Sequence, residues 1–265
     1  MIPELEARLR QALDHPALVI AVSGGVDSMT LAYLAHRWNP GAVSMFHAVS
    51  PAVPHAATER VERFAARHGW ALTVSGSGEF EDARYRENPV DRCYFCKTNL
   101  YDRIRALVEG TIASGANTDD LGDYRPGLKA AAERRIVHPF VEAGIGKSGI
   151  RALARHYGLD DLAELPAQPC LASRVETGIA INADDLGFID AVETALAPLV
   201  PGPANLRCRV THNGIVVEVD AAHAGSPLLL RQAEVLCLQA GRPFAGVRAY
   251  ERGSAFLGKP VTEHA

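Results

Sequence analysis

The sequence predicts an α/β fold: a doubly wound parallel sheet followed by a smaller C-terminal α+β domain. Apolar runs and amphipathic helical patterns alternate from residue 17 to residue 157, which is typical of successive β-α-β units. A glycine-rich turn at residues 23–28 joins the first apolar run to the first helical pattern. The alternation of strand and helix patterns then ends at three prolines, Pro166, Pro169 and Pro201. We therefore place the domain boundary between residues 165 and 166, which gives domains 1–165 and 166–265.

The first domain is expected to contain five strands with helices on both faces of the sheet. Residues 1–15 predict a helix with leucine at every fourth position. Thr58 is the expected N-cap of a later helix, and Gly69 and Gly158 are expected to end helices. Strands are predicted at residues 17–22, 42–49, 71–75, 111–115 and 136–140, and further helices at residues 27–37, 58–68, 98–108 and 146–157.

The second domain begins with a helical pattern and contains a hairpin. Asn213-Gly214 separates two apolar runs, and this dipeptide is typical of a tight β-hairpin turn. Helices are predicted at residues 183–199 and 228–240, and strands at residues 206–210, 214–220 and 244–250. Alternation of short strands and helices around a hairpin predicts a small α+β domain.

Composition and charge narrow the class of protein. The 265 residues are 48% hydrophobic and 22% charged, which suits a globular protein with a sizeable core. A net charge of -4 argues against an extended basic surface for nucleic acid. No signal peptide and no membrane-spanning apolar run is evident, so we expect a cytoplasmic protein without a membrane partner. The odd number of cysteines, five, favours metal or thiol chemistry over a disulfide framework.

The turn at residues 23–28 has the composition of a phosphate-binding loop. It lies between a predicted strand and helix, at the sheet edge where open α/β sheets bind ligands. Gly24 and Gly25 let the backbone approach a ligand, and the N–H groups that open the helix favour an anion. Ser23 and Ser28 add hydroxyl groups. Asp27 would repel phosphate, so we expect it to bind Mg²⁺ or to anchor the loop. A tight turn with a serine cap is the structural alternative.

A second polar stretch returns to the same edge after the fourth predicted strand. The amide of Asn117 and the carboxylates of Asp119, Asp120 and Asp123 lie there, and their oxygens could hold Mg²⁺ or the ribose of a nucleotide. Lys147 begins a later helix and could reach phosphate as a point charge. The alternatives are an acidic capped turn and an ordinary surface lysine.

Three cysteines are candidates for chemistry. Cys93 and Cys96 form a Cys-x-x-Cys pair, which suits metal binding or redox exchange, and Cys170 is the candidate third thiol. Three thiolates fit an iron–sulfur cluster with one open iron, although structural cysteines are an alternative. Cys208 and Cys237 have apolar neighbours and are expected in the core.

Together these motifs resemble a known family. The hexapeptide Ser-Gly-Gly-Val-Asp-Ser at residues 23–28 resembles the pyrophosphate loop (PP-loop) of the ATP pyrophosphatase superfamily, whose domain is Rossmann-like. Within it, residues 17–254 resemble LarE, the ATP-dependent sulfur transferase of nickel-pincer cofactor synthesis. The narrower match rests on Asp-Arg-Cys-Tyr-Phe-Cys-Lys at residues 91–97, Asp-Tyr-Arg-Pro-Gly at residues 123–127 and Cys-Leu-Ala-Ser-Arg at residues 170–174.

The resemblance assigns expected roles. ATP would adenylylate a carboxylate of a pyridinium mononucleotide with release of pyrophosphate, and a sulfur nucleophile would then displace AMP. Lys97 would steady the acyl adenylate. ATP and Mg²⁺ would be held by Ser23, Gly24, Gly25, Asp27, Ser28, Asn117, Asp120 and Lys147, and the anionic substrate by Ser173, Arg174, Glu193, Arg207 and Arg209.

The family delivers sulfur in two ways. Some members sacrifice one cysteine at the position of Cys170, whereas others hold a [4Fe-4S] cluster through three cysteines. Because Cys93 and Cys96 accompany Cys170, we expect the cluster route here. The resemblance also implies a homo-oligomer, with sulfide or a sulfur-donor protein as the sulfur source.

Other functions remain compatible with the phosphate loop. A tRNA thiolase would share the loop and the thiols but would require a basic RNA-binding extension. An amide ligase of the superfamily has no use for three thiols. A nucleotide-binding module without enzymatic activity needs neither the thiols nor the clustered arginines.

Overall fold

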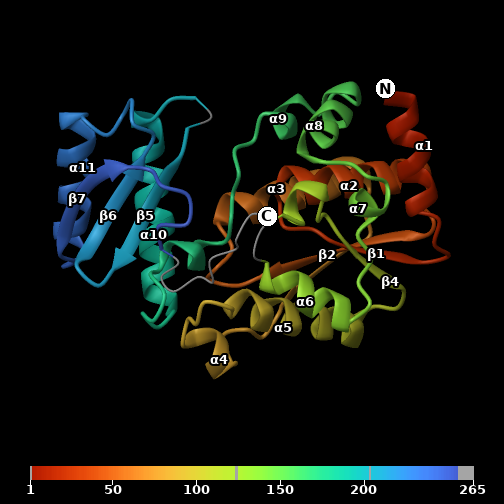
Figure 1. Ribbon diagram of the computed structural model, residues 1–265, viewed down its shortest axis with the longest axis horizontal. Coiled ribbons are helices and arrows are strands. Elements are labelled where there is room, and N and C mark those ends of the chain that lie inside the picture. Colours follow the sequence, from red (N-terminus) through yellow and green to blue (C-terminus); the bar gives the residue numbers. More distant parts are fainter. Residues whose placement is uncertain (1, 123–124, 203, 256–265) are drawn as a thin grey trace. The chain divides into compact units, whose positions relative to one another are not determined.

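The computed structural model describes residues 2–122, 125–202 and 204–255 (Figure 1). The chain forms two compact units. The first consists of Met1–Asp82 and Cys93–Ala167, and the second of Ala83–Arg92 together with the chain from Gln168 onward. No helix in the described ranges has both the length and the apolar character needed to cross a bilayer.

The first unit is built on a four-stranded parallel sheet. Its strands are β1 (Leu18–Ala21), β2 (Val43–Val49), β3 (Leu72–Gly76) and β4 (Thr111–Ser114), in the order β3-β2-β1-β4. All three pairings are parallel. β1 therefore lies inside the sheet, and the turn that follows it opens at the carboxyl edge between β2 and β4. This arrangement confirms the predicted α/β fold class.

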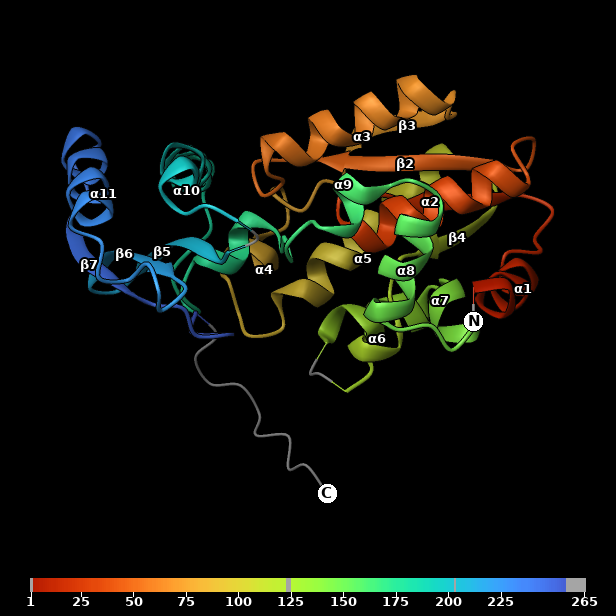
Figure 2. The same cartoon turned by 90° about the horizontal axis from the view of Figure 1, so that it is seen from above.

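Helices cover both faces of this sheet because the side chains of β1 alternate between two cores. Leu18 and Ile20 join the larger core, whereas Val19 joins a smaller core on the other face. The larger core receives residues from α1 (Ile2–Ala12), α2 (Val26–Trp38), α3 (His55–His68), α8 (Lys147–His156) and α9 (Asp160–Ala163), and the smaller core from α5 (Arg92–Leu107) and α6 (Pro126–Glu133). Figure 1 shows α2 and α3 on one side of the strands and α5 and α6 on the other. α8 and α9 pack against α2 (Figure 2).

The helices of the first unit follow the predicted pattern with shifted ends. Gly69 (φ 67°) ends α3 in the left-handed conformation, and Gly158 (φ 70°) follows α8, as expected for glycine. The helices are α1 (Ile2–Ala12), α2 (Val26–Trp38), α3 (His55–His68), α5 (Arg92–Leu107), α6 (Pro126–Glu133), α7 (Pro139–Glu142), α8 (Lys147–His156) and α9 (Asp160–Ala163).

Three local predictions are wrong. The fifth strand at 136–140 is reduced to one parallel bridge between Ala113 and Val137, because Pro139 lacks an N–H group and opens α7 instead. Thr58 does not cap α3, since the helix begins at His55 after Pro54. α5 begins at Arg92 rather than near residue 98, so the Cys-x-x-Cys pair lies in its first turns.

The second unit contains a three-stranded mixed sheet. β5 (Leu206–Thr211) pairs antiparallel with β6 (Gly214–Val219), and β6 pairs parallel with β7 (Phe244–Ala249). The predicted hairpin is confirmed: His212 and Asn213 form the turn, and Gly214 has φ 115°. Helices α10 (Ala183–Leu196) and α11 (Pro227–Gln239) lie side by side over one face of this sheet (Figure 2). The smaller α+β fold is therefore as predicted.

A short segment from the first half of the sequence belongs to the second unit. Ala83–Arg92 contains the short helix α4 (Ala83–Arg86) and the fully buried Asn88. The Asn88 amide donates to the carbonyls of Glu176 (2.8 Å) and Ile179 (2.9 Å), and its own carbonyl accepts from the N–H of Gly178 (3.1 Å). These bonds attach the segment to the loop at residues 175–179. Nothing in the composition of residues 83–92 indicated this placement.

Candidate functional site

The loop after β1 ends at an uncapped helix. α2 begins at Val26, and its N-cap is Gly25 in an extended conformation (φ -80°, ψ 160°), with no side-chain hydrogen bond to the first turn. An α-helix leaves its first N–H groups without partners inside the helix, and this end of the helix carries a partial positive charge. The start of α2 is therefore suited to an anion such as phosphate.

Two glycines let neighbouring elements close around this loop. Gly24 has φ +80°, and a Cβ atom there would lie 2.7 Å from the Ala57 carbonyl oxygen on α3. A Cβ atom on Gly115, just after β4, would lie 2.7 Å from the Ser28 nitrogen. Any larger residue at either position would push the loop away from its supports. The sequence analysis singled out Gly24 but attached no role to Gly115.

The two serines brace the loop from inside. The Ser23 N–H donates to Ser28 Oγ (3.1 Å), and the two hydroxyl oxygens lie 3.2 Å apart. Ser28 Oγ also donates to the Gly25 carbonyl (3.3 Å). Ser28 is buried and Ser23 is exposed, so Ser28 mainly holds the shape of the loop, whereas the Ser23 hydroxyl can also reach a ligand.

Asp27 carries a carboxylate oxygen without a partner among the described residues. Its Oδ2 accepts a hydrogen bond from Asn117 Nδ2 (3.3 Å), whereas its buried Oδ1 has no hydrogen-bond donor. Burial, together with the nearby charge of Asp120, raises the pKa of Asp27 to about 6. A carboxylate that is buried and half satisfied fits a cation ligand, and Mg²⁺ binds through carboxylate oxygens. These residues therefore fit the predicted Mg²⁺.

The second polar stretch meets the first at the sheet edge. Asn117 and Asp120 form a capping box around a 3₁₀ turn (Thr118–Asp120), which orients the Asn117 amide toward Asp27. Asp120 Oδ1 lies 2.8 Å from an Arg125 nitrogen and 3.8 Å from Lys147 Nζ. Asp27, Asn117, Asp120 and Lys147 therefore lie close together within the first unit. Asp123 and Tyr124, which belong to the family-like motif, lie outside the described residues.

Lys147 also marks the start of α8, as predicted. Its N–H donates to Asp119 Oδ2 (2.9 Å), so Asp119 caps this helix and is committed to the fold rather than to a ligand. Arg151, one turn later, donates to the carbonyls of Ala163 and Leu165. The charge of Asp120 raises the pKa of Asp27, and the charges of Lys147, Arg151 and Arg125 act in the opposite direction.

The cysteine pair and Lys97 share one helix. Cys93 and Cys96 lie three residues apart in α5, and both are partly buried. Lys97 Nζ lies 5.8 Å from the centre of the Tyr101 ring. The five cysteines, all within the described residues, form no disulfide. Across the described ranges, no group of three or more His, Cys, Asp or Glu side chains converges as a metal site.

Cys170 belongs to the second unit, where an arginine holds its turn. It precedes a 3₁₀ helix (Leu171–Arg174), and Arg174 donates back to the carbonyls of Pro169 (2.6 Å) and Cys170 (3.2 Å). Cys93 and Cys96 lie in the first unit. Binding of one cluster by the three cysteines stays a prediction.

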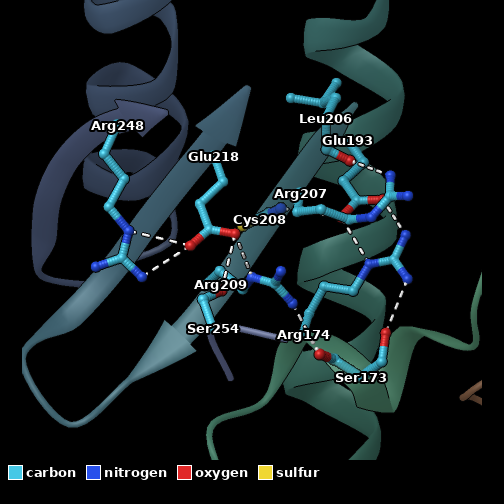
Figure 3. A network of polar contacts seen from close by, with 10 residues as sticks. All are labelled: Ser173, Arg174, Glu193, Leu206, Arg207, Cys208, Arg209, Glu218, Arg248 and Ser254. Atoms are coloured by element: carbon cyan, nitrogen blue, oxygen red, sulfur yellow. Dashed lines mark hydrogen bonds and ion pairs between the residues drawn. The ribbon is translucent and has the colours of Figure 1, made fainter. Parts of the chain in front are cut away.

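The predicted substrate residues of the second unit form a buried ionic network (Figure 3). Arg174 donates to both oxygens of Glu193, at 2.9 Å each, and to the Ser173 hydroxyl (3.1 Å). Arg209 donates to the Ser173 carbonyl (2.8 Å). The sequence-predicted residues Ser173, Arg174, Glu193 and Arg209 are therefore neighbours, but most N–H groups of Arg174 are already directed at protein acceptors.

Glu218 completes the network, and sequence analysis missed it. Its carboxylate is fully buried and accepts from Arg209 Nε (2.8 Å), Arg248 Nη2 (2.8 Å) and Ser254 Oγ (3.0 Å). The available signal was a single acidic residue in an otherwise apolar strand pattern. A charge in such a strand rarely stays buried without a partner, so an arginine on the neighbouring strand could have been expected.

Arg207 differs from the other three arginines of the network, Arg174, Arg209 and Arg248. One of its guanidinium N–H groups donates to the Leu206 carbonyl (2.7 Å), and the guanidinium lies 5.8 Å from the centre of the Tyr250 ring. Burial lowers the pKa of Arg207, and the neighbouring charge of Arg174 adds to this effect. An anion beside Arg207 would therefore be favourable. On the Arg209 side, a pocket of about 220 Å³ is lined by Glu176, Arg209, Thr211, Asn213, Arg248 and Ser254, among others.

No protein-family model matches the chain. Comparison with known proteins identifies three relatives that are similar to it over most of its length. A pyridinium-3,5-bisthiocarboxylic acid mononucleotide synthase of Lactiplantibacillus plantarum is 28% identical over 225 residues, which cover 82% of this chain and 79% of the relative. The uncharacterized protein MJ0830 of Methanocaldococcus jannaschii is 27% identical over 221 residues, which cover 82% of this chain and 83% of the relative.

The third relative is the uncharacterized protein slr1717 of Synechocystis. It is 35% identical over 205 residues, which cover 76% of this chain and 75% of the relative. Identity of this level over three quarters of both sequences indicates common descent and a shared fold. The chain belongs to the protein family that includes slr1717.

Proposed function

We propose that this protein is an ATP-dependent sulfur transferase that activates a substrate carboxylate as an acyl adenylate and then replaces AMP by sulfur. One observation carries the proposal: the uncapped start of α2 lies beside a buried carboxylate oxygen of Asp27 that has no donor among the described residues. An anion site next to a cation ligand is what the phosphates of Mg²⁺-bound ATP require. The name of the Lactiplantibacillus relative, a bisthiocarboxylic acid mononucleotide synthase, supports sulfur insertion into a mononucleotide.

In the first step, a substrate carboxylate oxygen attacks the α-phosphorus of ATP. The bond from that phosphorus to the bridging oxygen breaks, and pyrophosphate leaves with the electron pair. The N–H groups at the start of α2 and the Ser23 hydroxyl would hold the departing pyrophosphate, while Lys147 would neutralise part of its charge. Asn117 would keep the Asp27 carboxylate in place through its hydrogen bond.

Mg²⁺, held by Asp27, would supply charge neutralisation for the phosphates. The residues that face Asp27 set the charge around this cation. Asp120 adds a second negative charge, and Arg125 and Lys147 offset it. Asp120 is held by both cations, so we assign Asp27 rather than Asp120 as the direct ligand.

In the second step, a sulfur nucleophile attacks the carbonyl carbon of the acyl adenylate. The carbon–oxygen bond to AMP breaks, and AMP leaves with the electron pair. Lys97 would steady the acyl adenylate. Cys93, Cys96 and Cys170 would hold a [4Fe-4S] cluster, and such a cluster would supply the sulfide. Alternatively, Cys170 alone attacks, and loss of its α-proton with cleavage of its Cβ–S bond leaves dehydroalanine and a thiocarboxylate.

The substrate is proposed to be a pyridinium mononucleotide of nickel-pincer cofactor synthesis. Arg207 and Arg209 would bind its phosphate or carboxylate, because both lie on the polar face of β5 and burial lowers the pKa of Arg207, so that a neighbouring anion would favour its charged form. Ser173, Arg174 and Glu193 would shape this site through their mutual hydrogen bonds. Sulfide or a sulfur-donor protein would replenish the sulfur, and the enzyme would act as a homo-oligomer.

The test is the product set with ATP, Mg²⁺ and candidate acids. AMP and pyrophosphate are expected, whereas ADP and phosphate would overturn the assignment to this chemistry. Asp27→Asn should abolish both products, and Asp161→Asn, an exposed acid on α9, is the matched control. Formation of an amide instead of a thiocarboxylate would indicate an amide ligase. Turnover that requires RNA would indicate a tRNA thiolase.

A further inference from the structure

An arginine on α3 contacts the phosphate loop from outside. Arg60 Nη1 donates to the Gly24 carbonyl oxygen at 2.8 Å, across 36 positions of sequence. The side chain is half-buried, and burial, with Arg63 nearby, lowers the pKa of Arg60. A buried cation is costly unless it makes specific hydrogen bonds. Arg60 is not among the residues proposed to bind ATP, Mg²⁺, the substrate or sulfur.

The contact determines which way a peptide group faces. No cis peptide occurs in the described chain, so the Gly24–Gly25 peptide is trans, and its carbonyl and N–H groups point in opposite directions. With the Gly24 carbonyl held toward α3 by Arg60, the Gly25 N–H points away from α3. Gly25 is the N-cap of α2, so its N–H belongs to the uncapped group at the proposed phosphate site.

Two adjacent glycines make this peptide easy to rotate without such a restraint. Glycine has no Cβ atom, and it populates left-handed and right-handed conformations about equally. Gly24 is held at φ +80° and lies so close to α3 that a Cβ atom would overlap the Ala57 backbone. The Arg60 hydrogen bond therefore favours one orientation of this peptide.

α3 is itself fixed to the residue before the loop. The fully buried His47 on β2 contacts the Val22 carbonyl through Nδ1 and Thr58 Oγ1 through Nε2, both at 2.9 Å. A carbonyl can only accept, so Nδ1 carries the proton and Nε2 accepts from the Thr58 hydroxyl. Because β1, β2 and α3 are joined through this ring, Arg60 reaches Gly24 from a rigid support.

We propose that Arg60 is a positioning residue of the phosphate loop, which holds the Gly24 carbonyl so that the Gly25 N–H faces the pyrophosphate of ATP. The inference rests on the proposed function because it requires that this loop binds phosphate. Arg60 acts through the peptide and not by touching the ligand. Its loss should therefore weaken binding of the phosphates without weakening binding of the nucleoside.

The test compares calorimetric binding of Mg²⁺-pyrophosphate and of adenosine. Arg60→Ala should weaken pyrophosphate binding roughly ten-fold, as expected for one lost hydrogen bond to a charged group, with adenosine binding unchanged. Arg60→Lys should restore part of the affinity, since an ammonium group can donate to the same carbonyl. Arg67→Ala, an exposed arginine in the last turn of α3, should change neither value.

A second readout separates positioning from direct contact. In ligand-free protein labelled with ¹⁵N-glycine, Arg60→Ala should shift the amide signal of Gly25, and Arg67→Ala should not. A ten-fold loss of affinity with an unmoved Gly25 signal would mean that Arg60 touches the ligand, which overturns the inference. Unchanged pyrophosphate binding by Arg60→Ala also overturns it and leaves the proposed function standing. A wild-type protein that binds neither ATP nor pyrophosphate overturns both.

Discussion

Arg174 and Glu193 form a two-pronged ion pair, with Nε–Oε1 and Nη2–Oε2 distances of 2.9 Å each. The Arg174 side chain is 3% exposed and that of Glu193 is 15% exposed. The same Glu193 oxygen that meets Arg174 Nε also accepts the N–H of Cys208 (2.9 Å). Helix α10 is thereby joined to β5 and to the turn that carries Cys170. The pair orders the backbone around this thiol.

Removal of Glu193 should therefore be severe. Glu193→Ala leaves the guanidinium of Arg174 buried without its counter-ion, which typically costs about 3–5 kcal/mol of unfolding free energy. Glu164→Ala removes the partner of Arg155 in an exposed pair and should cost less than about 1 kcal/mol. Urea unfolding followed by circular dichroism measures both. If both variants lost the same free energy of unfolding, the buried ion pair would contribute no more stability than the exposed one.

The raised pKa of Asp27 predicts that stability depends on pH. The native state binds the carboxyl proton of Asp27 more tightly than the unfolded chain does, because the pKa is about 6 in the native state and 3.8 in the unfolded chain. Stability should therefore fall as pH rises from about 4 to about 6 and remain lower above that range. The ionised carboxylate costs at most about 3 kcal/mol, since one pH unit corresponds to about 1.4 kcal/mol.

Asp27→Asn should thus stabilise the ligand-free protein at pH 8 while it abolishes catalysis. At pH 5 the native wild-type carboxyl is mostly protonated, so the difference from the variant should shrink. Thermal unfolding at the two pH values, with Asp161→Asn as control, measures the effect. A variant that is less stable than wild type at pH 8 would contradict a buried, half-satisfied carboxylate.

Among the described residues, two residues other than glycine have a left-handed backbone. We expect opposite effects on stability when each is changed to glycine. Arg135 (φ 51°) is exposed, so Arg135→Gly should stabilise the protein by about 1 kcal/mol through relief of strain. Asn88 (φ 53°) has the same backbone, but its amide satisfies buried carbonyls. Asn88→Gly should therefore destabilise the protein by about 1–3 kcal/mol. The melting temperatures of both variants test these predictions. A stabilised Asn88→Gly variant would show that those hydrogen bonds contribute little.

The cysteines give a prediction about sulfur. Anaerobically purified protein is expected to be brown, and changing Cys93, Cys96 or Cys170 to alanine should remove both iron and sulfur transfer. Cys208→Ala and Cys237→Ala should spare both, because burial raises the pKa of these thiols and keeps them protonated. Iron and sulfide analysis tests the cluster. Active, colourless Cys93→Ala protein that loses about 34 Da from Cys170 would instead establish its sacrifice.

The predictable parts of the fold are those that local patterns determine. Period and glycine positions located β1, the turn at residues 23–28 and the C-terminal ends of α3 and α8, since each depends on neighbours in sequence. The strand expected at 136–140 failed because Pro139 overrides an apolar run. The role of Asn88 could not be assigned from the sequence, because its carbonyl partners lie 88 and 91 positions away. Glu218 was missed because it combines a partner 9 positions away on the paired strand with partners 30 and 36 positions away.

The residues of the candidate site likewise divide into those that the sequence predicts and those that it does not. Asp27, Asn117, Asp120 and Lys147 were expected together because strands of one parallel sheet end at one edge, and they do meet there. Arg60 was not foreseen, since an arginine inside an amphipathic helix is ordinarily a surface residue. Its contact with Gly24 depends on the angle at which α3 crosses the loop, which no periodicity encodes.

The placement of Ala83–Arg92 has a consequence for how the chain is made. The polypeptide passes from one unit to the other three times, after Asp82, after Arg92 and after Ala167. Asn88 leaves the ribosome long before the carbonyls of Glu176 and Ile179 that it must bond. The second unit therefore cannot finish folding during synthesis until its later residues emerge. Residues 1–167 expressed alone would contain Ala83–Arg92 without the loop at residues 175–179 that it bonds, so we expect the two units to fold properly only when they are expressed as one polypeptide.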